Sequence, residues 1–202
     1  ILVPHEHGDH INGVGKLARK HNLHVWLSAG TYRADRTGEL PTFCLFNSHE
    51  PFELNDLQIT PFPVPHDAFE PCQFTFSDGD KKLGLATDLG CETPHVIEQL
   101  SGCDALVLEC NHDEELLAYG IYPPHLKRRV GGDHGHLSNK QAAKLLEKLD
   151  NSRLQHIVAA HLSEKHNTPL LAQEALRGAL GCSADWIAIA DQQQGLSWRD
   201  VA

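Results

Sequence analysis

The chain has 202 residues, and its 17 Lys and Arg against 27 Asp and Glu give a formal net charge of −10 at pH 7. This length is sufficient for a hydrophobic core, and we predict a single domain over residues 1–202. The acidic balance argues against broad electrostatic adhesion to nucleic acid or to an anionic membrane, although bound divalent cations would add positive charge locally. Fifteen His are many for this length and favour a metal-binding protein.

The six Cys are scattered and include no Cys-x-x-Cys pair, which leaves a zinc ribbon without support. We interpret them as reduced residues of a cytoplasmic protein. No apolar stretch is long enough to cross a bilayer, and no signal peptide is recognisable. The chain begins inside a strand, so we expect a fragment whose first strands are absent.

A dense group of metal-binding side chains follows the apolar residues 1–3, which predict a buried strand. His5 and His7 are two apart in an extended segment, so both can reach one metal ion. Asp9 and His10 follow the turn that a glycine permits and can face a second ion. Imidazole and carboxylate ligands suit zinc and its first-row neighbours.

In the first half of the chain, hydrophobic periodicity and turn signals predict short elements. Asp88 follows the last of these strands and precedes Leu89 and Gly90, a position that can face a cleft, although by itself it would be a turn residue as often as a ligand. Residues 38–49 are expected to be irregular. Helices are predicted at 13–20 and 29–36, and strands at 24–27, 52–54, 57–64, 72–77 and 82–87, the last two forming a hairpin.

The second half alternates helices and strands. An apolar strand at 105–108 leads to Glu109, and a strand at 155–159 leads to His161. Ser138 and Gln141 form a capping box, and the start of that helix is a potential phosphate site. Helices are predicted at 94–100, 114–119, 138–149 and 169–180, and closing strands at 186–189 and 196–198. The basic run at 126–130 is explained equally well as a solvated helix face.

Strands that first form hairpins and later alternate with helices predict a mixed α/β (α+β) fold, with a sheet sandwich and helices on its outer faces. Outside the ligand candidates, His21 and His24 have no partner at ligand spacing, and five further histidines are grouped with them. We predict that they are mostly surface residues: His21, His24, His49, His95, His125, His156 and His166.

The series His5-x-His7-x-Asp9-His10, followed by His66, Asp88 and His161, resembles the metal ligands of metallo-β-lactamase-fold hydrolases. The resemblance covers residues 1 to at least 170 and implies an αββα sandwich. Within the superfamily the chain is most similar to the YycJ-type (WalJ) nuclease branch. That similarity rests on Pro65-His66-Asp67-Ala68, Glu109-Cys110-Asn111-His112-Asp113, Leu126-Lys127-Arg128-Arg129, Gly135-His136-Leu137-Ser138-Asn139 and His161-Leu162-Ser163.

The resemblance implies a cytoplasmic, dinuclear metal-dependent phosphodiesterase, with DNA favoured over RNA as the substrate of an exonuclease. Two divalent ions, zinc or else manganese, would activate a metal-bound hydroxide for in-line attack at phosphorus. The implied ligands are His5, His7 and His66 for the first ion and Asp9, His10 and His161 for the second, with Asp88 bridging both.

The resemblance also implies roles in catalysis. Asp9 would orient the hydroxide, and His136 would give a proton to the leaving oxygen, unless it is only a helix-entry residue bonded to backbone. Glu109 or His112 would hold the ring of His136 in place. Ser138, Asn139 and Arg128 are candidates for substrate binding.

Two other functions stay open from the sequence. The same scaffold and ligands serve hydrolases of small esters, thioesters or lactones, and the acidic net charge favours that class. The chain is alternatively an inactive metal-binding fragment. The motif around His136 and the basic run at 127–129 favour the nuclease.

Overall fold

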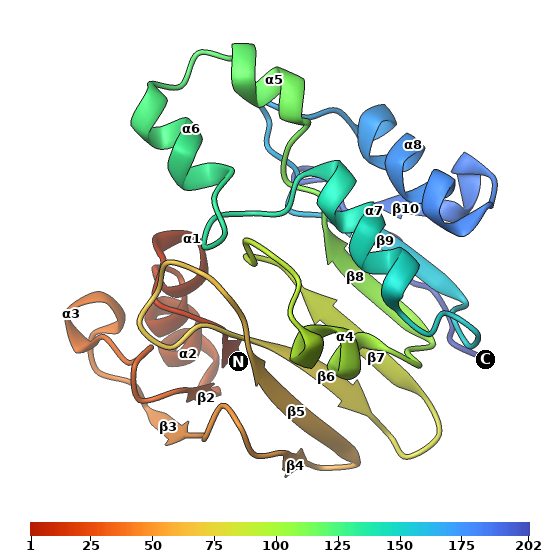
Figure 1. Cartoon of the computed structure of the whole chain (residues 1–202). Coiled ribbons are helices and arrows are strands. Elements are labelled where there is room, and N and C mark those ends of the chain that lie inside the picture. The colour runs from red at the N-terminus through yellow and green to blue at the C-terminus, as the bar shows by residue number, and fades with distance from the viewer.

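The computed structural model describes residues 1–202 and contains a smaller and a larger β-sheet (Figure 1). Leu2 and Trp26 of the smaller sheet pack on a cluster that includes Ile59 and Phe74 of the larger one. The smaller sheet has three strands in the order β1-β2-β3, and all of its strand pairs are parallel. These strands are β1 (Leu2–Val3), β2 (His24–Leu27) and β3 (Thr42–Leu45).

The larger sheet has seven strands in the order β10-β9-β8-β7-β6-β5-β4. Its first part is an antiparallel meander from β4 to β7, and its second part, from β7 to β10, is parallel. The parallel strands place their carboxyl ends at one edge of the sheet. The strands are β4 (Phe52–Leu54), β5 (Leu57–Pro63), β6 (Cys72–Ser77), β7 (Lys82–Ala86), β8 (Ala105–Glu109), β9 (His156–Ala160) and β10 (Ile187–Ile189).

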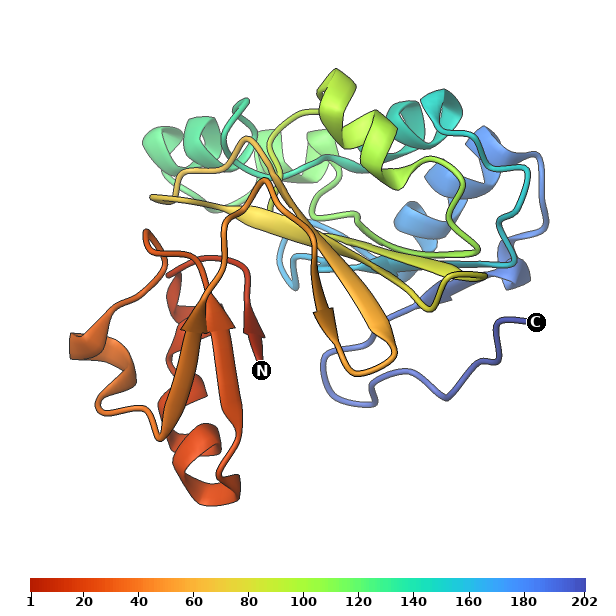
Figure 2. The ribbon, with the colours of Figure 1, turned by 90° about the horizontal axis from the view of Figure 1, so that it is seen from below.

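Helices form the outer layers of the sandwich. Figure 2 shows α4, α7 and α8 on one face of the larger sheet, and the smaller sheet with its helices on the other side. This helix–sheet–sheet–helix order confirms the predicted αββα sandwich. The helices are α1 (Gly8–Ile11), α2 (Val14–His21), α3 (Ala34–Thr37), α4 (Pro94–Leu100), α5 (Glu114–Tyr119), α6 (Pro124–Val130), α7 (Asn139–Lys148) and α8 (Pro169–Leu180), with a 3₁₀ turn at Ala184–Trp186.

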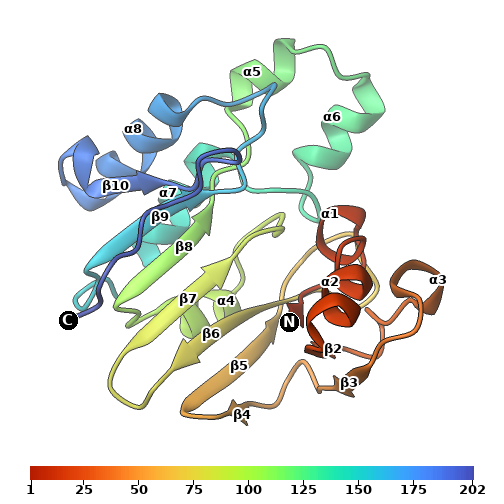
Figure 3. The same cartoon turned by 180° about the vertical axis from the view of Figure 1, so that it is seen from behind.

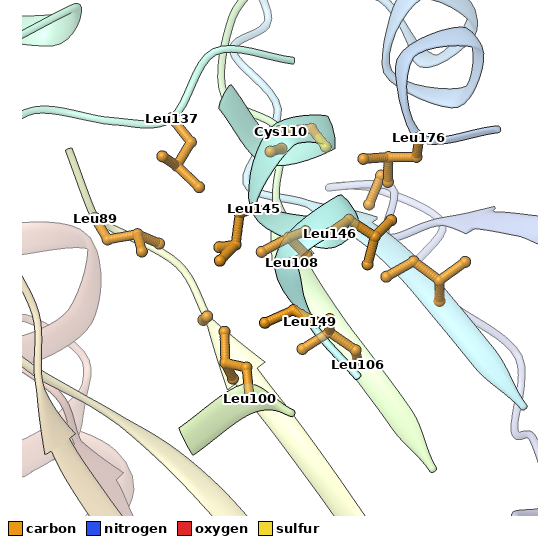
Figure 4. Close-up of a cluster of buried hydrophobic side chains, with 14 of the residues drawn as sticks. Leu89, Leu100, Leu106, Leu108, Cys110, Leu137, Leu145, Leu146, Leu149 and Leu176 are labelled. Carbon is orange, nitrogen blue, oxygen red and sulfur yellow. The ribbon is translucent and has the colours of Figure 1, made fainter. Parts of the chain in front are cut away.

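The main core lies between the larger sheet and α4, α7 and α8. On helix α7, Leu145 and Leu146 lie on the buried face, away from the polar residues of the helix. They pack in the same cluster as Leu106 and Leu108 of β8 (Figure 4). Burying each such side chain contributes about 1.5–3 kcal/mol. This packing fixes β8, and therefore the edge of the sheet at which β8 ends.

The predicted helix starts are confirmed at three places. Thr93 and Thr168 each accept a hydrogen bond from the first turn of α4 and α8, and each is followed by Pro. Ser138 and Gln141 form the predicted capping box of α7. These caps determine where the loops that precede the helices are held.

Several predictions of local structure were wrong. The helix expected at 29–36 is only α3, because Ser28 and Thr31 bond to each other in a turn and Glu70 accepts the N–H of Gly30. The segment expected to be irregular contains β3, an edge strand whose mostly exposed residues hide the alternation of a half-buried strand. No strand forms at 196–198, which belong to the C-terminal tail, residues 190–202.

The tail crosses the open face of the larger sheet near β8 and β9 (Figure 3). It is held to β9 and the residue before it: Gln155 exchanges hydrogen bonds with Ala202, and His156 bonds to the carbonyl of Asp200. The six Cys are all free thiols, as predicted. None of the helices combines the length and the apolar character that a membrane span requires.

Candidate metal centre

The carboxyl ends of three neighbouring parallel strands carry the central side chains of the site. Asp88 lies two residues beyond β7, Glu109 ends β8, and His161 directly follows β9. Open sheets of this kind bind ligands beyond the carboxyl ends of their strands. Figure 1 shows α1, with the residues around it, arriving at the same edge from the smaller sheet.

The first ligand group consists of His5, His7 and His66, whose ring nitrogens lie within 4.8 Å of one another. Nε2 of His7 donates to the carbonyl of Asp67, and Nδ1 of His66 donates to the carbonyl of Gly135. The other nitrogens of these rings, Nδ1 of His7 and Nε2 of His66, face each other at 3.1 Å, and in a neutral ring such a nitrogen carries a lone pair. Two facing lone pairs repel, and a cation between them turns the repulsion into ligation.

The second ligand group consists of Asp9, His10, Asp88 and His161, whose ligand atoms also lie within 4.8 Å of one another. Nε2 of His161 is 3.7 Å from Asp9 Oδ2 and 3.6 Å from Asp88 Oδ1. Nε2 of His10 is 3.1 Å from Asp88 Oδ2, yet neither atom makes a hydrogen bond. Oxygen and imidazole nitrogen together form a donor set that suits zinc and manganese.

Asp88 faces both groups. One oxygen, Oδ1, is 3.9 Å from Nε2 of His66 in the first group, and the other is the oxygen that faces His10 in the second. Its side chain is only 2% exposed. Burial would raise the pKa of Asp88, but His10 and His161 hold it well below its usual range, so the carboxylate is ionised.

The backbone is strained where two of these residues sit. Asp88 and His161 have φ angles of 53° and 56°, in the left-handed region that residues other than glycine rarely adopt. Such strain costs on the order of 1–3 kcal/mol per residue and occurs mainly at functional sites. Both residues lie at strand ends, where the turn directs the side chain into the site rather than along the sheet.

Glu109 supports the site from beneath. Its carboxylate is completely buried and accepts five hydrogen bonds, from Nδ1 of His136 and His161 and from three backbone N–H groups. Burial would raise the pKa of Glu109, but the two histidines hold it below its usual value. The bond to Nδ1 leaves Nε2 of each ring to face the site, which is how an outer carboxylate orients a ligating histidine. The three backbone donors are Asp88, Leu89 and Leu137.

The residues present fit a divalent metal. Both ring nitrogens of His5, Nε2 of His10 and Oδ2 of Asp88 are buried without a hydrogen-bond partner, an expensive arrangement unless a ligand occupies the site. Burial, followed by the neighbouring His10, lowers the pKa of His5 to about 3, so this imidazole is neutral and its lone pairs are available. Metal ligation requires that form.

Residues 131–136, here called the strap, lead from α6 toward α7 and carry His136. The strap packs tightly at two glycines. A Cβ at Gly135 would lie 2.2 Å from the carbonyl oxygens of Arg129 and Val130, and one at Gly90 would lie 2.3 Å from the Asp133 backbone. Larger residues at these positions would displace the strap, and with it His136 and the carbonyl that anchors His66.

A family model for the beta-lactamase superfamily domain matches residues 1–157. The chain belongs to the metallo-β-lactamase superfamily. Exodeoxyribonuclease YycJ of Bacillus anthracis is 38% identical over 184 residues, which are 89% of this chain and 70% of that relative. Exodeoxyribonuclease WalJ of Streptococcus pneumoniae serotype 2 strain D39 is 34% identical over 178 residues, 85% of this chain and 66% of that relative. The chain thus spans about two thirds of the length of these relatives.

Solved structures establish the fold. The metallo-β-lactamase fold protein YhfI from Bacillus subtilis superposes with a TM-score of 0.73 at 16% identity, covering 98% of this chain and 76% of its own. Zinc-bound PqqB from Methylobacterium extorquens gives 0.71 at 18% identity, covering 98% and 72%. The predicted metallo-β-lactamase fold is confirmed, and superfamily membership together with the two relatives makes this protein a metal-dependent hydrolase.

The other sequence-predicted residues differ in where they lie relative to this metallo-β-lactamase site. Ser138 and Asn139 are buried and already bonded within the protein, Ser138 to Glu114 and Asn139 to Asn167. Their geometry therefore gives no support to substrate binding by their side chains. His112 is buried and makes no hydrogen bond to His136, so the support of that ring comes from Glu109.

Two features of the site were missed by the sequence analysis. Arg129, rather than the predicted Arg128, bonds to Asp67 next to the first ligand group, while Arg128 is exposed and makes no hydrogen bond or ion pair. His166 was expected at the surface but is buried, because the ring of Tyr122 packs on it 4.2 Å away and Gly120 closes over it. For the arginine, the basic run at 127–129 correctly indicated the turn of α6 that contacts the site, but not which of its residues does so.

A cleft of about 810 Å³ opens from His136 and His161 along the outside of the site. Its lining is mainly polar and includes the ring of Tyr122, with Nζ of Lys165 5.6 Å from the ring centre. The cleft extends to residues 189–194, and no residue of the first ligand group lines it. Its amide side chains are Asn111, Asn167, Gln192, Gln193 and Gln194.

Proposed function

We propose that this protein is a dinuclear metal-dependent phosphodiesterase that acts as a DNA exonuclease. Two exodeoxyribonuclease relatives at 34–38% identity support this function. The observation that carries it is His136, whose Nδ1 donates to the buried carboxylate of Glu109 at 2.9 Å while Nε2 is left for a substrate. This arrangement provides a proton donor in addition to the ligand groups, which breaking a phosphodiester requires.

In this proposal His5, His7 and His66 would hold one ion and Asp9, His10 and His161 the other, with Asp88, which faces both groups, available to each. When bound, such ions activate a water as nucleophile and neutralise negative charge on the phosphoryl oxygens, with zinc the expected metal and manganese the other candidate. Asp9, which is the most exposed of the carboxylates here, would orient that water.

His136 would supply the proton that the leaving oxygen needs. Burial would lower the pKa of His136, but the hydrogen bond and charge of Glu109 raise it above its usual value. The raised pKa favours the protonated ring, which is the form that a general acid needs. As the proton leaves Nε2, the Glu109 carboxylate keeps Nδ1 protonated and the ring in its orientation.

The cleft supports a polymeric substrate. The exposed amides of Gln192, Gln193 and Gln194 can bond to sugar and base edges, and Tyr122 with Lys165 offers a ring and a cation at one wall. Stacking of a base on an aromatic ring contributes about 1–3 kcal/mol, and it needs no particular sequence. The net charge of −10 does not oppose this proposal, because divalent ions bound at the ligand groups would add positive charge where a phosphate of the substrate binds.

The test is a substrate panel with the zinc- or manganese-loaded protein. We expect release of mononucleotides from 5′-phosphorylated duplex and single-stranded DNA and slow hydrolysis of bis(p-nitrophenyl) phosphate. Thioesters and lactones should be turned over much more slowly. Efficient turnover of a thioester or lactone with intact DNA would contradict the proposal, and so would full metal occupancy with no turnover of any substrate.

A further inference from the structure

The three basic residues of the last turn of α6 do different things. Lys127 donates from Nζ to the carbonyl of Ala118 and so joins α6 to α5. Arg128 is exposed and makes no hydrogen bond or ion pair. Arg129 turns toward the site and donates from Nε to Oδ2 of Asp67. Of these three adjacent basic residues, only Arg129 forms a salt bridge with a carboxylate, that of Asp67.

That partner is part of the wall of the first ligand group. The carbonyl of Asp67 accepts from Nε2 of His7, and Oδ1 of Asp67 lies 3.6 Å from Nε2 of both His7 and His66. Its other oxygen is the one bound to Arg129. Asp67 therefore connects the guanidinium of Arg129 directly to the histidines that would hold the first ion.

The backbone of Arg129 is fixed as well. Its carbonyl accepts from the N–H of Gly132 and lies against Gly135, where there is no room for a Cβ. The same strap anchors His66 through the Gly135 carbonyl. Arg129 is thus held at both ends relative to the ligand group, although its side chain is 58% exposed.

The guanidinium still has donors to offer. Asp67 uses only Nε, and neither Nη group has a hydrogen-bond partner in the structure. Two parallel Nη donors match the spacing of phosphate oxygens, which explains the frequent use of Arg for this anion.

We propose that Arg129, positioned by Asp67, binds a phosphate group of the substrate beside the first ligand group. This inference rests on the proposed function for the identity of the substrate, but it assigns a phosphate site that any phosphate ester would occupy. Asp67 is a positioning residue here, because it acts through Arg129. Arg128, on the same turn, is the matched comparison because its substitution removes the same charge.

The test measures phosphate binding without turnover. Metal-free wild type and variants are titrated with a fluorescent 5′-phosphorylated oligothymidylate by anisotropy. The metal-loaded proteins are compared by the inhibition constant of thymidine 5′-monophosphate against bis(p-nitrophenyl) phosphate. Arg129→Gln should weaken both by about tenfold or more, as expected for the loss of a charged hydrogen bond. Arg129→Lys should restore only part, because an ammonium lacks the planar fork. Arg128→Gln should cost several-fold less.

The positioning role of Asp67 is tested by a double-mutant cycle. Asp67→Asn should weaken binding on its own and add little once Arg129→Gln is present, since both changes act on one interaction. Melting temperatures measured alongside separate this from a structural bridge. A lowered melting temperature with unchanged phosphate affinity in Arg129→Gln would overturn the proposal, and so would equal losses in Arg128→Gln and Arg129→Gln.

The outcomes separate this inference from the proposed function. If wild type leaves DNA intact while Arg129→Gln still loses affinity for thymidine 5′-monophosphate, the nuclease function fails and the phosphate site stands. If wild type degrades DNA while Arg129→Gln binds the nucleotide as tightly as wild type does, the phosphate site fails alone.

Discussion

The two ligand groups are neighbours that are built differently. The first contains three imidazoles and no carboxylate of its own, and backbone carbonyls of Asp67 and Gly135 orient two of its rings. The second combines two imidazoles with two carboxylates, and the buried charge of Glu109 orients His161. The first group therefore depends on the shape of two loops, whereas the second depends on electrostatics at the ends of the strands.

Charge follows the same division. His5 in the first group is neutral, with a pKa lowered to about 3 by burial and then by His10. In the second group, His161 and then other contacts hold the pKa of Asp9 well below its usual range, and Asp88 is ionised as well. A cation is thus attracted to the second group by formal negative charge and to the first mainly by lone pairs. The comparison predicts that the two groups respond to different substitutions.

The largest effect is expected where the groups meet. Asp88→Asn removes the only carboxylate that faces both, so the protein should lose most of its metal at both positions and with it its turnover. Elemental analysis after dialysis measures this, with His95→Gln, an exposed histidine on α4, as the control. Full occupancy in Asp88→Asn would show that the groups are independent.

A residue outside both groups should separate chemistry from metal binding. His136→Ala is expected to keep its metal and lose on the order of 10²–10⁴-fold in turnover, as removal of a general acid does. The loss should be smaller for a substrate with a good leaving group such as p-nitrophenolate than for DNA. Equal turnover of wild type and variant on both substrates would end the assignment.

Glu109→Gln should affect one group and spare the other. The amide carries no charge to hold the two rings, and its NH2 group would face the N–H groups of Leu89 and Leu137 that now donate to Oε2, so the second group should lose about 10–100-fold in metal affinity. The first group, whose rings are held by carbonyls, should be nearly unchanged. Competition with a chelator resolves two affinities, and a parallel decrease in both would contradict the division.

The smallest expected effect is a difference in proton release. Burial would lower the pKa of His161, but contacts with Asp9 and Glu109 raise it to about 11. In the metal-free protein this ring therefore carries a proton at pH 7, which a metal must displace. Affinity at the second group should therefore rise about tenfold per pH unit toward that pKa. His5 is already deprotonated, so filling the first group releases no proton from it. Calorimetry in buffers of different ionisation enthalpy counts the protons, and equal release at both steps would be the contrary result.

The sequence was informative about the ligands for a physical reason. His5 and His7 follow a strand at a spacing of two, and Asp88 and His161 follow strands that the hydrophobic runs identify. Ligand identity is therefore encoded locally. Which of these residues converge is encoded in the sheet order; the family resemblance gave the ligand set, and periodicity alone did not.

Other features are not written in local patterns. Asp88 and His161 adopt a left-handed backbone conformation although neither is a glycine, the residue type that would have indicated it in the sequence. The bond between Asp67 and Arg129 joins residues 62 apart in sequence, and the choice of Arg129 over Arg128 depends on the rotation of one helical turn. Strand β3 was missed because an edge strand exposed on both faces lacks alternation.

The buried carboxylate of Glu109 makes the stability of the fold depend on the histidines of the site. Three of its five donors belong to the backbone and two to the site histidines, so a descendant that discarded those histidines would retain an under-solvated anion in its interior. An uncompensated buried charge costs several kcal/mol, a large share of the stability of an ordinary domain. Loss of activity in this lineage is therefore expected to begin at the glutamate itself, and retention of an acidic residue at this position in a distant homologue would signal that the histidines are still in use.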